Sequence, residues 1–300
     1  MKKFICPVPY LHVGTKTNGD YHMCIQSNTH RETRGLLKLN DSVINAKTAF
    51  QDIRNSDLLK DTRQHILQNK WPAQCKRCFQ EESSGNISRR LRYLETYKDI
   101  VEDIYFKTNN DGSINPDDFF LCDYEIRLGN ICNLKCRMCW PGESNYWFKE
   151  FKETVGNSFT IGNTKYNSKN IDWFNNSELL NQLMKKENLQ HAKMLSFSGG
   201  EPLLYDDHIL ILEKAIEYDC AKNIQLDYAT NGTISNTKLL NIWEKFKQVT
   251  VTVSVDDLYE KNEYIRYPSN WSNIEKVLLE YNICLISELF YCIYILYQIK

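Results

Sequence analysis

The sequence lacks net charge, a leader-like segment and any repeated or low-complexity tract. Its 37 basic and 38 acidic residues leave a net charge of −1, which provides no general attraction to nucleic acid or a membrane surface. The first residues, MKKFICPVPYLHV, include two lysines but not the apolar core of a signal peptide. We therefore expect a cytoplasmic globular protein whose 300 residues suffice for one large domain or two smaller ones.

Cysteine, in contrast, is abundant. Eleven cysteines in a chain expected to stay in a reducing compartment indicate metal or redox chemistry rather than a disulfide framework. Four of them fit buried small hydrophobes because they lie in apolar or strand-like stretches: Cys122, Cys220, Cys284 and Cys292. The other seven form a triplet and a quartet. The triplet is Cys132, Cys136 and Cys139, and the quartet is Cys6, Cys24, Cys75 and Cys78.

From about residue 120 onward, short apolar segments alternate with amphipathic ones. Strands are predicted over 119–128, 193–198, 223–229 and 249–255. Helices are predicted over 206–220, 236–248 and 269–281. This alternation indicates an α/β fold in which parallel strands are joined by right-handed crossovers.

Each predicted strand is followed by an unusual segment. Because parallel strands place their carboxyl ends at the same edge of a sheet or barrel, we expect the four segments to converge there. In chain order they are the cysteine-triplet loop, Gly199-Gly200-Glu201-Pro202, Thr230-Asn231-Gly232 and Asp256-Asp257.

The spacing of the triplet leaves two structures to consider. Thiols at positions i, i+4 and i+7 would share one face of a helix, as a buried stripe does. Asn133 near the start and Pro141-Gly142 at the end favour instead a loop that wraps a ligand. Three thiolates suit either a zinc site lacking its fourth ligand or an iron–sulfur cluster with one iron left open.

The C-x3-C-x2-C loop after the first strand, with Gly-Gly-Glu-Pro after the second, resembles the radical S-adenosylmethionine enzymes. The resemblance implies a partial (β/α) barrel in which Cys132, Cys136 and Cys139 hold a [4Fe-4S] cluster with an open iron for S-adenosylmethionine. It further implies reductive cleavage of that cofactor to a 5′-deoxyadenosyl radical, which abstracts hydrogen from a substrate. A one-electron reductase or a flavodoxin- or ferredoxin-type protein would supply the electron.

The same resemblance assigns further cofactor contacts. Gly199 and Gly200 leave backbone atoms uncovered for the cofactor's ammonium group, and Glu201 adds negative charge beside it. Met138 is expected near the adenine, Asn231 and Ser254 or Asp256 near the ribose, and Arg266 at the carboxylate. For Asn231, Ser254 or Asp256, and Arg266, a plain turn or capping role fits the sequence equally well.

The quartet has its own sequence context. Between Cys6 and Cys24, the turn Asn18-Gly19 separates two extended stretches, and an amphipathic helix or helix pair over 50–71 then leads to Cys75-x2-Cys78. This order resembles the twitch or SPASM auxiliary cluster modules, although here it precedes the core. Four thiolates fit either a second [4Fe-4S] cluster or a structural zinc. By resemblance, such modules imply a peptide or small natural-product substrate.

The expected organisation is a small α+β cysteine module (1–82), a connector (83–118) and the radical core (119–300). An insertion over 143–190 carries predicted helices at 143–153 and 176–186. The apolar tail 281–300 predicts one buried strand and nothing that matches a sixth core strand. We therefore expect a shortened core with an exposed edge strand and weak or absent activity.

Two alternatives to an active enzyme remain. One is an inactive, truncated radical S-adenosylmethionine protein. The other is a non-catalytic adaptor that holds zinc or iron–sulfur clusters at both cysteine sets. The Gly199-Gly200-Glu201 segment argues against the adaptor, because a metal-binding adaptor has no need of it.

Overall fold

The computed structural model describes residues 4–29, 35–48, 53–156, 159–161, 164–166, 169–175 and 177–281. The chain divides into two compact units. The first comprises Met1–Lys16, Asp20–Glu125 and Asn176–Ala192, and the second comprises Thr17–Gly19, Ile126–Asn175 and Lys193–Lys300. Strand β5 (Asp123–Arg127) begins in the first unit and ends in the second.

The second unit is built on strands in the order β10-β9-β8-β5. Strand β9 (Gln225–Thr230) pairs in parallel with both β8 (Met194–Ser198) and β10 (Gln248–Val253). The four strands predicted from residue 119 onward are therefore confirmed, with somewhat shorter bounds, and so is their mostly parallel arrangement. In β10 every second side chain is buried, as the period of a strand requires.

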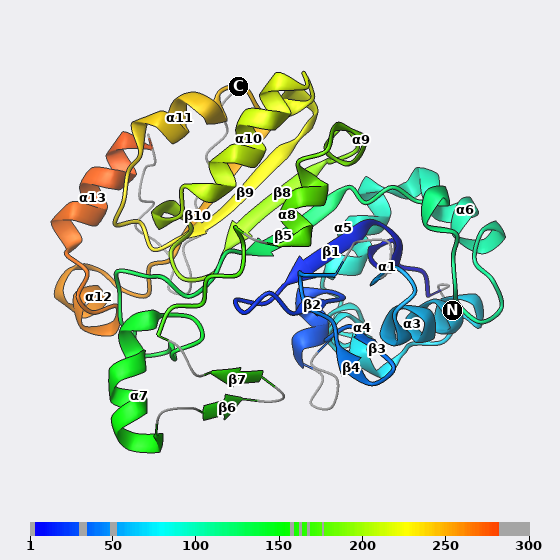
Figure 1. Cartoon of the computed structure of the whole chain (residues 1–300), viewed down its shortest axis with the longest axis horizontal. Helices are drawn as coiled ribbons and strands as arrows, with labels where there is room; N and C mark the ends of the chain where they lie inside the picture. The colour runs from blue at the N-terminus through cyan, green and yellow to red at the C-terminus, as the bar shows by residue number, and fades with distance from the viewer. Residues whose placement is uncertain are drawn as a thin grey trace. The chain divides into compact units, whose positions relative to one another are not determined.

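Helices follow the strands of the second unit. The predicted ones are α10 (Asp207–Glu217), α11 (Thr237–Trp243) and α13 (Trp271–Glu280), and α12 (Tyr259–Ile265) was not predicted. Figure 1 shows α10 running beside β9. Leu239, Trp243 and Phe246, predicted to share one face, are all buried. No helix in the described ranges is both long and apolar enough to cross a membrane.

The predicted insertion contains both expected helices and one element that was not predicted. Helix α7 (Phe148–Val155) lies in the second unit, whereas α8 (Glu178–Leu183) and α9 (Lys186–Leu189) belong to the first. Between them, β6 (Phe159–Ile161) and β7 (Thr164–Tyr166) pair as an antiparallel hairpin. Strands of three residues are too short to show a period in the sequence. The strand predicted within 281–300 lies outside the described residues apart from Tyr281.

In the first unit, β1 (His12–Thr15) pairs antiparallel with β2 (Tyr21–His22) and parallel with the start of β5. The two extended stretches expected between Cys6 and Cys24 are thus present around the Asn18-Gly19 turn, except that Val8–Leu11, directly after Cys6, forms the helix α1. The other elements are short: α1 (Val8–Leu11), η1 (Ile25–Thr29), β3 (Lys38–Leu39), β4 (Ser42–Val43), α3 (Asp57–Leu67), η2 (Ala73–Cys75), α4 (Lys76–Ser83), α5 (Arg89–Thr96), η3 (Lys98–Ile100), α6 (Val101–Phe106) and η4 (Pro116–Asp118). Helix α3 covers most of the described part of the pattern over 50–71.

Two buried arginines fix the short helix α1. Such a helix leaves its last carbonyl groups without intrahelical partners. Arg63 donates from Nη2 to the Pro9 carbonyl at 2.6 Å, and Arg54 donates from Nη2 to the Tyr10 carbonyl at 3.0 Å. Arg54 also reaches the Phe119 carbonyl at 2.7 Å. These bonds hold the start of the first unit, and with it the segment that carries Cys6.

An aromatic layer packs α10 and α11 onto the strands of the second unit. The ring of His208, in the first turn of α10, lies 4.8 Å from that of Phe197 and 5.6 Å from that of Tyr228, centroid to centroid. Trp243 contacts Tyr228 from the other side at 4.9 Å. Burial lowers the pKa of His208 to about 4, so this imidazole is neutral within the folded core.

We expect His208→Phe to remove part of the acid sensitivity of folding. In the unfolded chain the histidine binds a proton below its ordinary pKa of 6.5, whereas in the folded chain it does so only below about 4. Wild-type stability is therefore lost as the pH falls through this window, by at most roughly 3 kcal/mol. Urea unfolding at pH 7 and pH 4.5 measures the loss, with His65→Gln on α3 as the control. An equally steep loss in His208→Phe would contradict a neutral core histidine.

Candidate active site

The triplet cysteines lie in a loop and not on a helix. Residues 131–144 contain no helix, which excludes the buried-stripe alternative. The loop is held at its middle, because the Arg137 amide donates to the Ile265 carbonyl at 2.9 Å and the Trp147 indole donates to the Cys136 carbonyl at 2.9 Å. The thiols are thus carried by a backbone that neighbouring segments fix.

All three thiols gather in one place. Cys132 and Cys136 are buried around Leu134, and Cys139 packs against them. A hydrogen bond between the Cys136 and Cys139 thiols lowers the pKa of Cys136 to about 7 and raises the pKa of Cys139. Burial raises the pKa of Cys132 to about 11, although the Leu134 amide donates to its Sγ at 3.4 Å. The chain therefore supplies the three convergent sulfurs that the sequence predicted.

The Gly199-Gly200 segment packs directly against the cysteine loop. Gly200 has a φ of +57°, and a Cβ placed on it would lie 2.2 Å from the Ile131 carbonyl oxygen. The next amide, that of Glu201, donates to the same oxygen at 2.8 Å. A side chain at position 200 would push these two segments apart. Glycine is therefore required here for close approach as well as for conformation.

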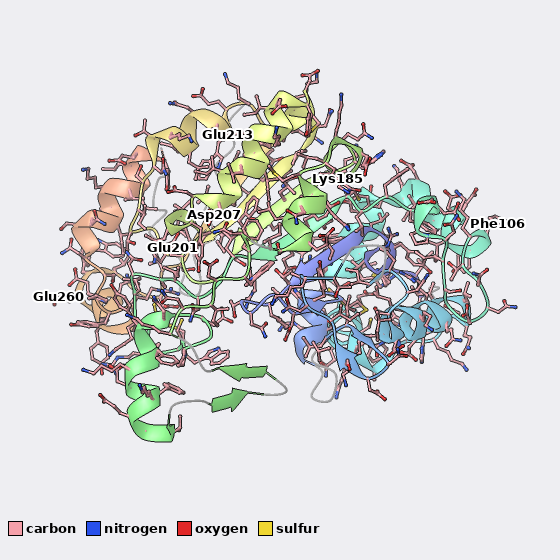
Figure 2. The ribbon with its side chains drawn as sticks, in the orientation of Figure 1. Phe106, Lys185, Glu201, Asp207, Glu213 and Glu260 are labelled. Atoms are coloured by element: carbon pink, nitrogen blue, oxygen red, sulfur yellow. The ribbon has the colours of Figure 1, made fainter. Side chains whose placement is uncertain are left out.

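Glu201 lies between the end of β8 and the start of α10, where Figure 2 labels it. Its carboxylate is fully buried and accepts three hydrogen bonds from the chain itself. The donors are the Thr230 hydroxyl at 2.7 Å, the Asn231 amide at 2.7 Å and the Leu203 amide at 3.1 Å. Burial raises its pKa to about 7, against the lowering effect of these bonds. The carboxylate thus joins the ends of β8 and β9, and its role towards a cofactor stays a prediction.

Asn231 links the end of β9 to the cysteine loop. Its Nδ2 donates to Asn133 Oδ1 at 2.8 Å and lies 3.8 Å from Cys132 Sγ. Asn133 in turn donates to the Thr233 hydroxyl at 2.7 Å. The segments Gly199–Pro202 and Thr230–Gly232 therefore converge on the cysteine-triplet loop, as predicted from their positions after the strands.

The remaining residues predicted to contact the cofactor make fewer contacts with the cysteine loop. Arg266 pairs with Asp256 at 2.7 Å, and its positive charge helps to lower the pKa of Cys136, after the larger effect of the Cys139 thiol. Ser254 donates its amide to the Thr230 carbonyl at 2.8 Å. Met138 is 55% exposed. The structure brings Arg266 and Asp256 to the thiols, whereas Ser254 is bonded to the end of β9 and Met138 is exposed.

Two residues that shape the loop were not predicted. The buried Asn130 donates from Nδ2 to the Pro141 carbonyl at 2.7 Å, closing the two ends of the loop on each other. The Tyr205 hydroxyl accepts the Ile131 amide at 2.7 Å. Asn130 directly follows a predicted strand, a place where a polar side chain is a usable signal. Tyr205 carries no comparable signal, because only the tertiary structure brings it to the loop.

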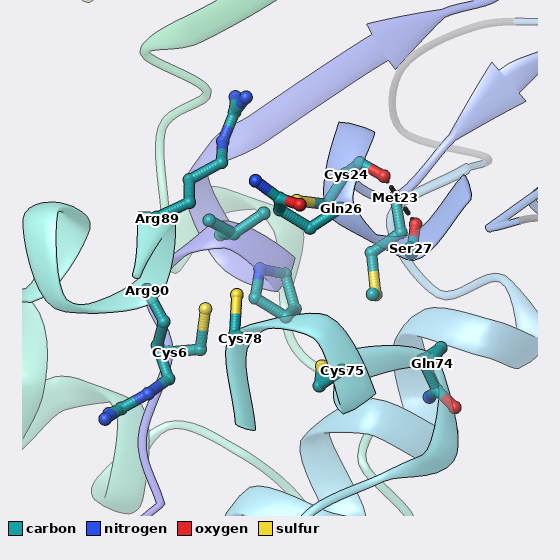
Figure 3. A pocket seen from close by; sticks show the side chains of 12 residues that line it. Cys6, Met23, Cys24, Gln26, Ser27, Gln74, Cys75, Cys78, Arg89 and Arg90 are labelled. Carbon is teal, nitrogen blue, oxygen red and sulfur yellow. Dashed lines mark hydrogen bonds between the residues drawn. The ribbon is translucent and has the colours of Figure 1, made fainter. Parts of the chain in front are cut away.

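The quartet forms a second site, within the first unit. Cys6, Cys24, Cys75 and Cys78 all line one cavity, which Figure 3 shows from close by. The pKa of Cys75 is raised well above its ordinary value. Burial is the largest cause, and the neighbouring Cys6, Cys24 and Cys78 raise it further. Negative charge on the other three thiols would therefore act on Cys75, which fits four sulfurs that lie around one cavity.

Burial raises the pKa of these thiols, and backbone amides oppose it at three of them. The amides of Val8, Gln26 and Arg90 lower the pKa of Cys6, Cys24 and Cys78 respectively. Donors of this kind stabilise the thiolate, which is the form that binds a metal. In the described part of the chain, no three His, Cys, Asp or Glu side chains stand as a ready metal-binding group. The donor chemistry of both cysteine sets nevertheless fits thiolate-held iron or zinc.

The second unit combines parallel strands, a three-thiol loop at the strand ends and a Gly-Gly-Glu segment packed against that loop. This combination is typical of a protein that binds a cofactor. Residues 126–282 match the family model described as the radical SAM superfamily. The chain belongs to this superfamily, whose members cleave S-adenosylmethionine at an iron–sulfur cluster.

Comparison with individual proteins adds one structure. A search of curated proteins finds no match. The chain is similar to the crystal structure of Streptococcus suis SuiB, with 16% identity and a TM-score of 0.35. The match covers 82% of this chain and 51% of the other, so the chain spans about half the length of that structure.

We expect Gly200→Ala to destabilise the second unit and to loosen the cysteine loop, because the new Cβ would strike the Ile131 carbonyl. Gly156→Ala is the matched control, since Gly156 also has a positive φ but has open space around its Cβ position. Gly200→Ala should cost about 1–3 kcal/mol more than the control. Equilibrium unfolding in urea measures both variants. Equal losses would show that the close approach is unimportant.

Proposed function

We propose that this chain is a radical S-adenosylmethionine enzyme that acts on a peptide-like substrate. Cys132, Cys136 and Cys139 would hold a [4Fe-4S] cluster. When bound, that cluster supplies one electron for cleavage of the cofactor, and the resulting 5′-deoxyadenosyl radical abstracts hydrogen from the substrate. The electron would come from a reductase, flavodoxin or ferredoxin. The observation that carries the proposal is the convergence of three thiols with the Gly-Gly-Glu segment in one place.

The residues around the triplet suit this role. The Leu134 amide and the Asn231 amide group donate towards Cys132, and the positive charge of Arg266 helps to lower the pKa of Cys136. These donors favour thiolates over thiols and so favour the ligand form. Arg266 is already paired with Asp256, so to bind a cofactor carboxylate it must share its guanidinium or exchange partners. Its five N–H donors permit the sharing.

We also propose that the quartet holds a second metal centre, in a module that resembles twitch or SPASM domains. Support comes from the shared cavity and the amide donors to three sulfurs. A [4Fe-4S] cluster and a structural zinc use the same ligand set, and metal analysis separates them. The peptide-like substrate rests on the resemblance of this module alone.

Changing any one triplet cysteine to alanine should abolish cofactor cleavage and remove one cluster. Wild-type protein purified without oxygen should contain about eight irons if both sites hold [4Fe-4S], and about four if the quartet holds zinc. Each triplet variant should lose about four irons and produce no 5′-deoxyadenosine with dithionite. Cys220→Ala, which removes a buried thiol outside both sets, is the control.

The double variant Cys75→Ala/Cys78→Ala separates the two sites. It should lose the quartet's metal and keep the triplet's iron. If a triplet variant still formed 5′-deoxyadenosine, the ligand assignment would be wrong. If the wild-type protein held zinc at both sites and cleaved nothing, the adaptor would be the better description.

A further inference from the structure

The wall of the quartet cavity has an unusual charge pattern. Twelve residues line it, four of them the cysteines. The charged side chains among these twelve are Arg89 and Arg90, and none of the twelve is acidic. Four thiolates around a divalent metal carry two negative charges, as does a thiolate-bound [4Fe-4S] cluster in its oxidised form. The wall is therefore complementary to an anionic metal–thiolate complex rather than to a free cation.

The two arginines are engaged differently. Arg90 is clamped, because its Nε donates to Glu82 Oε1 at 2.8 Å, its Nη1 donates to the Ile5 carbonyl at 2.9 Å, and its guanidinium lies over the Trp71 ring. Its backbone amide is the one that faces Cys78. Figure 3 shows the Arg89 and Arg90 side chains pointing in different directions. The Arg90 side chain thus fastens the start of α5 in place.

The Arg89 guanidinium is paired through its Nη2 but, among the described residues, not through its Nε. Its Nη2 lies 3.2 Å from Glu125 Oε2 and donates to the Tyr93 hydroxyl at 2.9 Å. Glu125 is also faced by His12 Nε2 at 3.6 Å and His22 Nε2 at 3.8 Å. The Nε of Arg89, in contrast, is buried and has no hydrogen-bond partner in the described part of the chain. A buried donor left unpaired is costly, which makes it a candidate contact for whatever fills the cavity.

The sheet beneath is arranged to keep this group in place. Gly14 on β1 stands opposite His22 on β2 and beside Glu125 on β5. A Cβ at Gly14 would lie 2.5 Å from His22 Nε2 and 3.0 Å from His12 Cε1. The bare glycine therefore makes room for both imidazoles around one carboxylate, and that carboxylate anchors Arg89.

We propose that Arg89 is the charge-compensating residue of the quartet's metal centre and that Glu125 positions it there. The inference rests on the proposed function in one respect, namely that the quartet binds metal. Arg89 also lowers the pKa of Cys24, in opposition to the larger effect of burial. Binding a divalent ion releases four thiol protons to the buffer and leaves the complex with two negative charges. A fixed positive charge favours that product.

The test is an anaerobic cobalt(II) titration of the metal-free full chain at constant pH, read by thiolate-to-cobalt charge-transfer absorption. The quartet's share is the absorption that Cys75→Ala/Cys78→Ala lacks. Arg89→Gln should bind cobalt about tenfold more weakly or worse than the wild type. Arg89→Lys should recover most of the affinity. Arg92→Gln removes an exposed arginine from the same helix and should leave the affinity unchanged.

A second variant keeps the proposal testable if Arg89→Gln does not fold. Glu125→Gln keeps a side-chain oxygen that can accept a hydrogen bond from Arg89, but it removes the negative charge that offsets the charge of Arg89. With Arg89 still in place, this variant should tighten cobalt binding, whereas a merely structural role for the network predicts weaker binding. Wild-type affinity in a folded Arg89→Gln, as judged by circular dichroism, would overturn the role of Arg89 alone. So would unchanged or weaker binding in Glu125→Gln. Absence of the quartet's absorption in the wild type would overturn the metal centre and the role of Arg89 together.

Discussion

The close contact between Gly200 and the Ile131 carbonyl is the constraint on which the candidate active site depends. It sets the separation between the loop that carries three thiols and the segment that follows β8. Glu201 extends this contact to a third segment, because its buried carboxylate accepts hydrogen bonds from Thr230 and Asn231 at the end of β9. One turn of backbone thus fixes three strand ends relative to one another. A ligand held by the thiols would find its surroundings already in position, which reduces the entropy lost on binding.

Both cysteine sets meet the same physical problem. Burial raises the pKa of most of these thiols, which on its own keeps sulfur protonated and unable to bind metal. The chain opposes this with amide N–H donors and with arginines near the sulfurs. Arg266 acts on Cys136 in the second unit, and Arg89 acts on Cys24 in the first. Two sites with different surroundings therefore use one device, a positive charge placed beside buried sulfur.

Much of this arrangement could be predicted from the sequence, because it depends on local patterns. The alternating valines of β10, the helical spacing of Leu239 and Trp243, and the glycines after β8 are each signals within a few residues. The triplet and its surroundings could be predicted as well, since parallel strands place their ends on one edge. The hairpin of β6 and β7 could not, because three-residue strands carry no period.

By itself the sequence determined which residues carry chemistry: seven clustered cysteines, a Gly-Gly-Glu segment and the order of strands and helices that presents them. Only the tertiary structure decided that Tyr205 and Asn130 shape the triplet loop and that Glu201 is spent on hydrogen bonds within the chain. It also decided that Arg89 lines the quartet's cavity and pairs with Glu125. The reason is physical. Burial and charge pairing arise between residues distant in the chain, and no local pattern records which residues will meet.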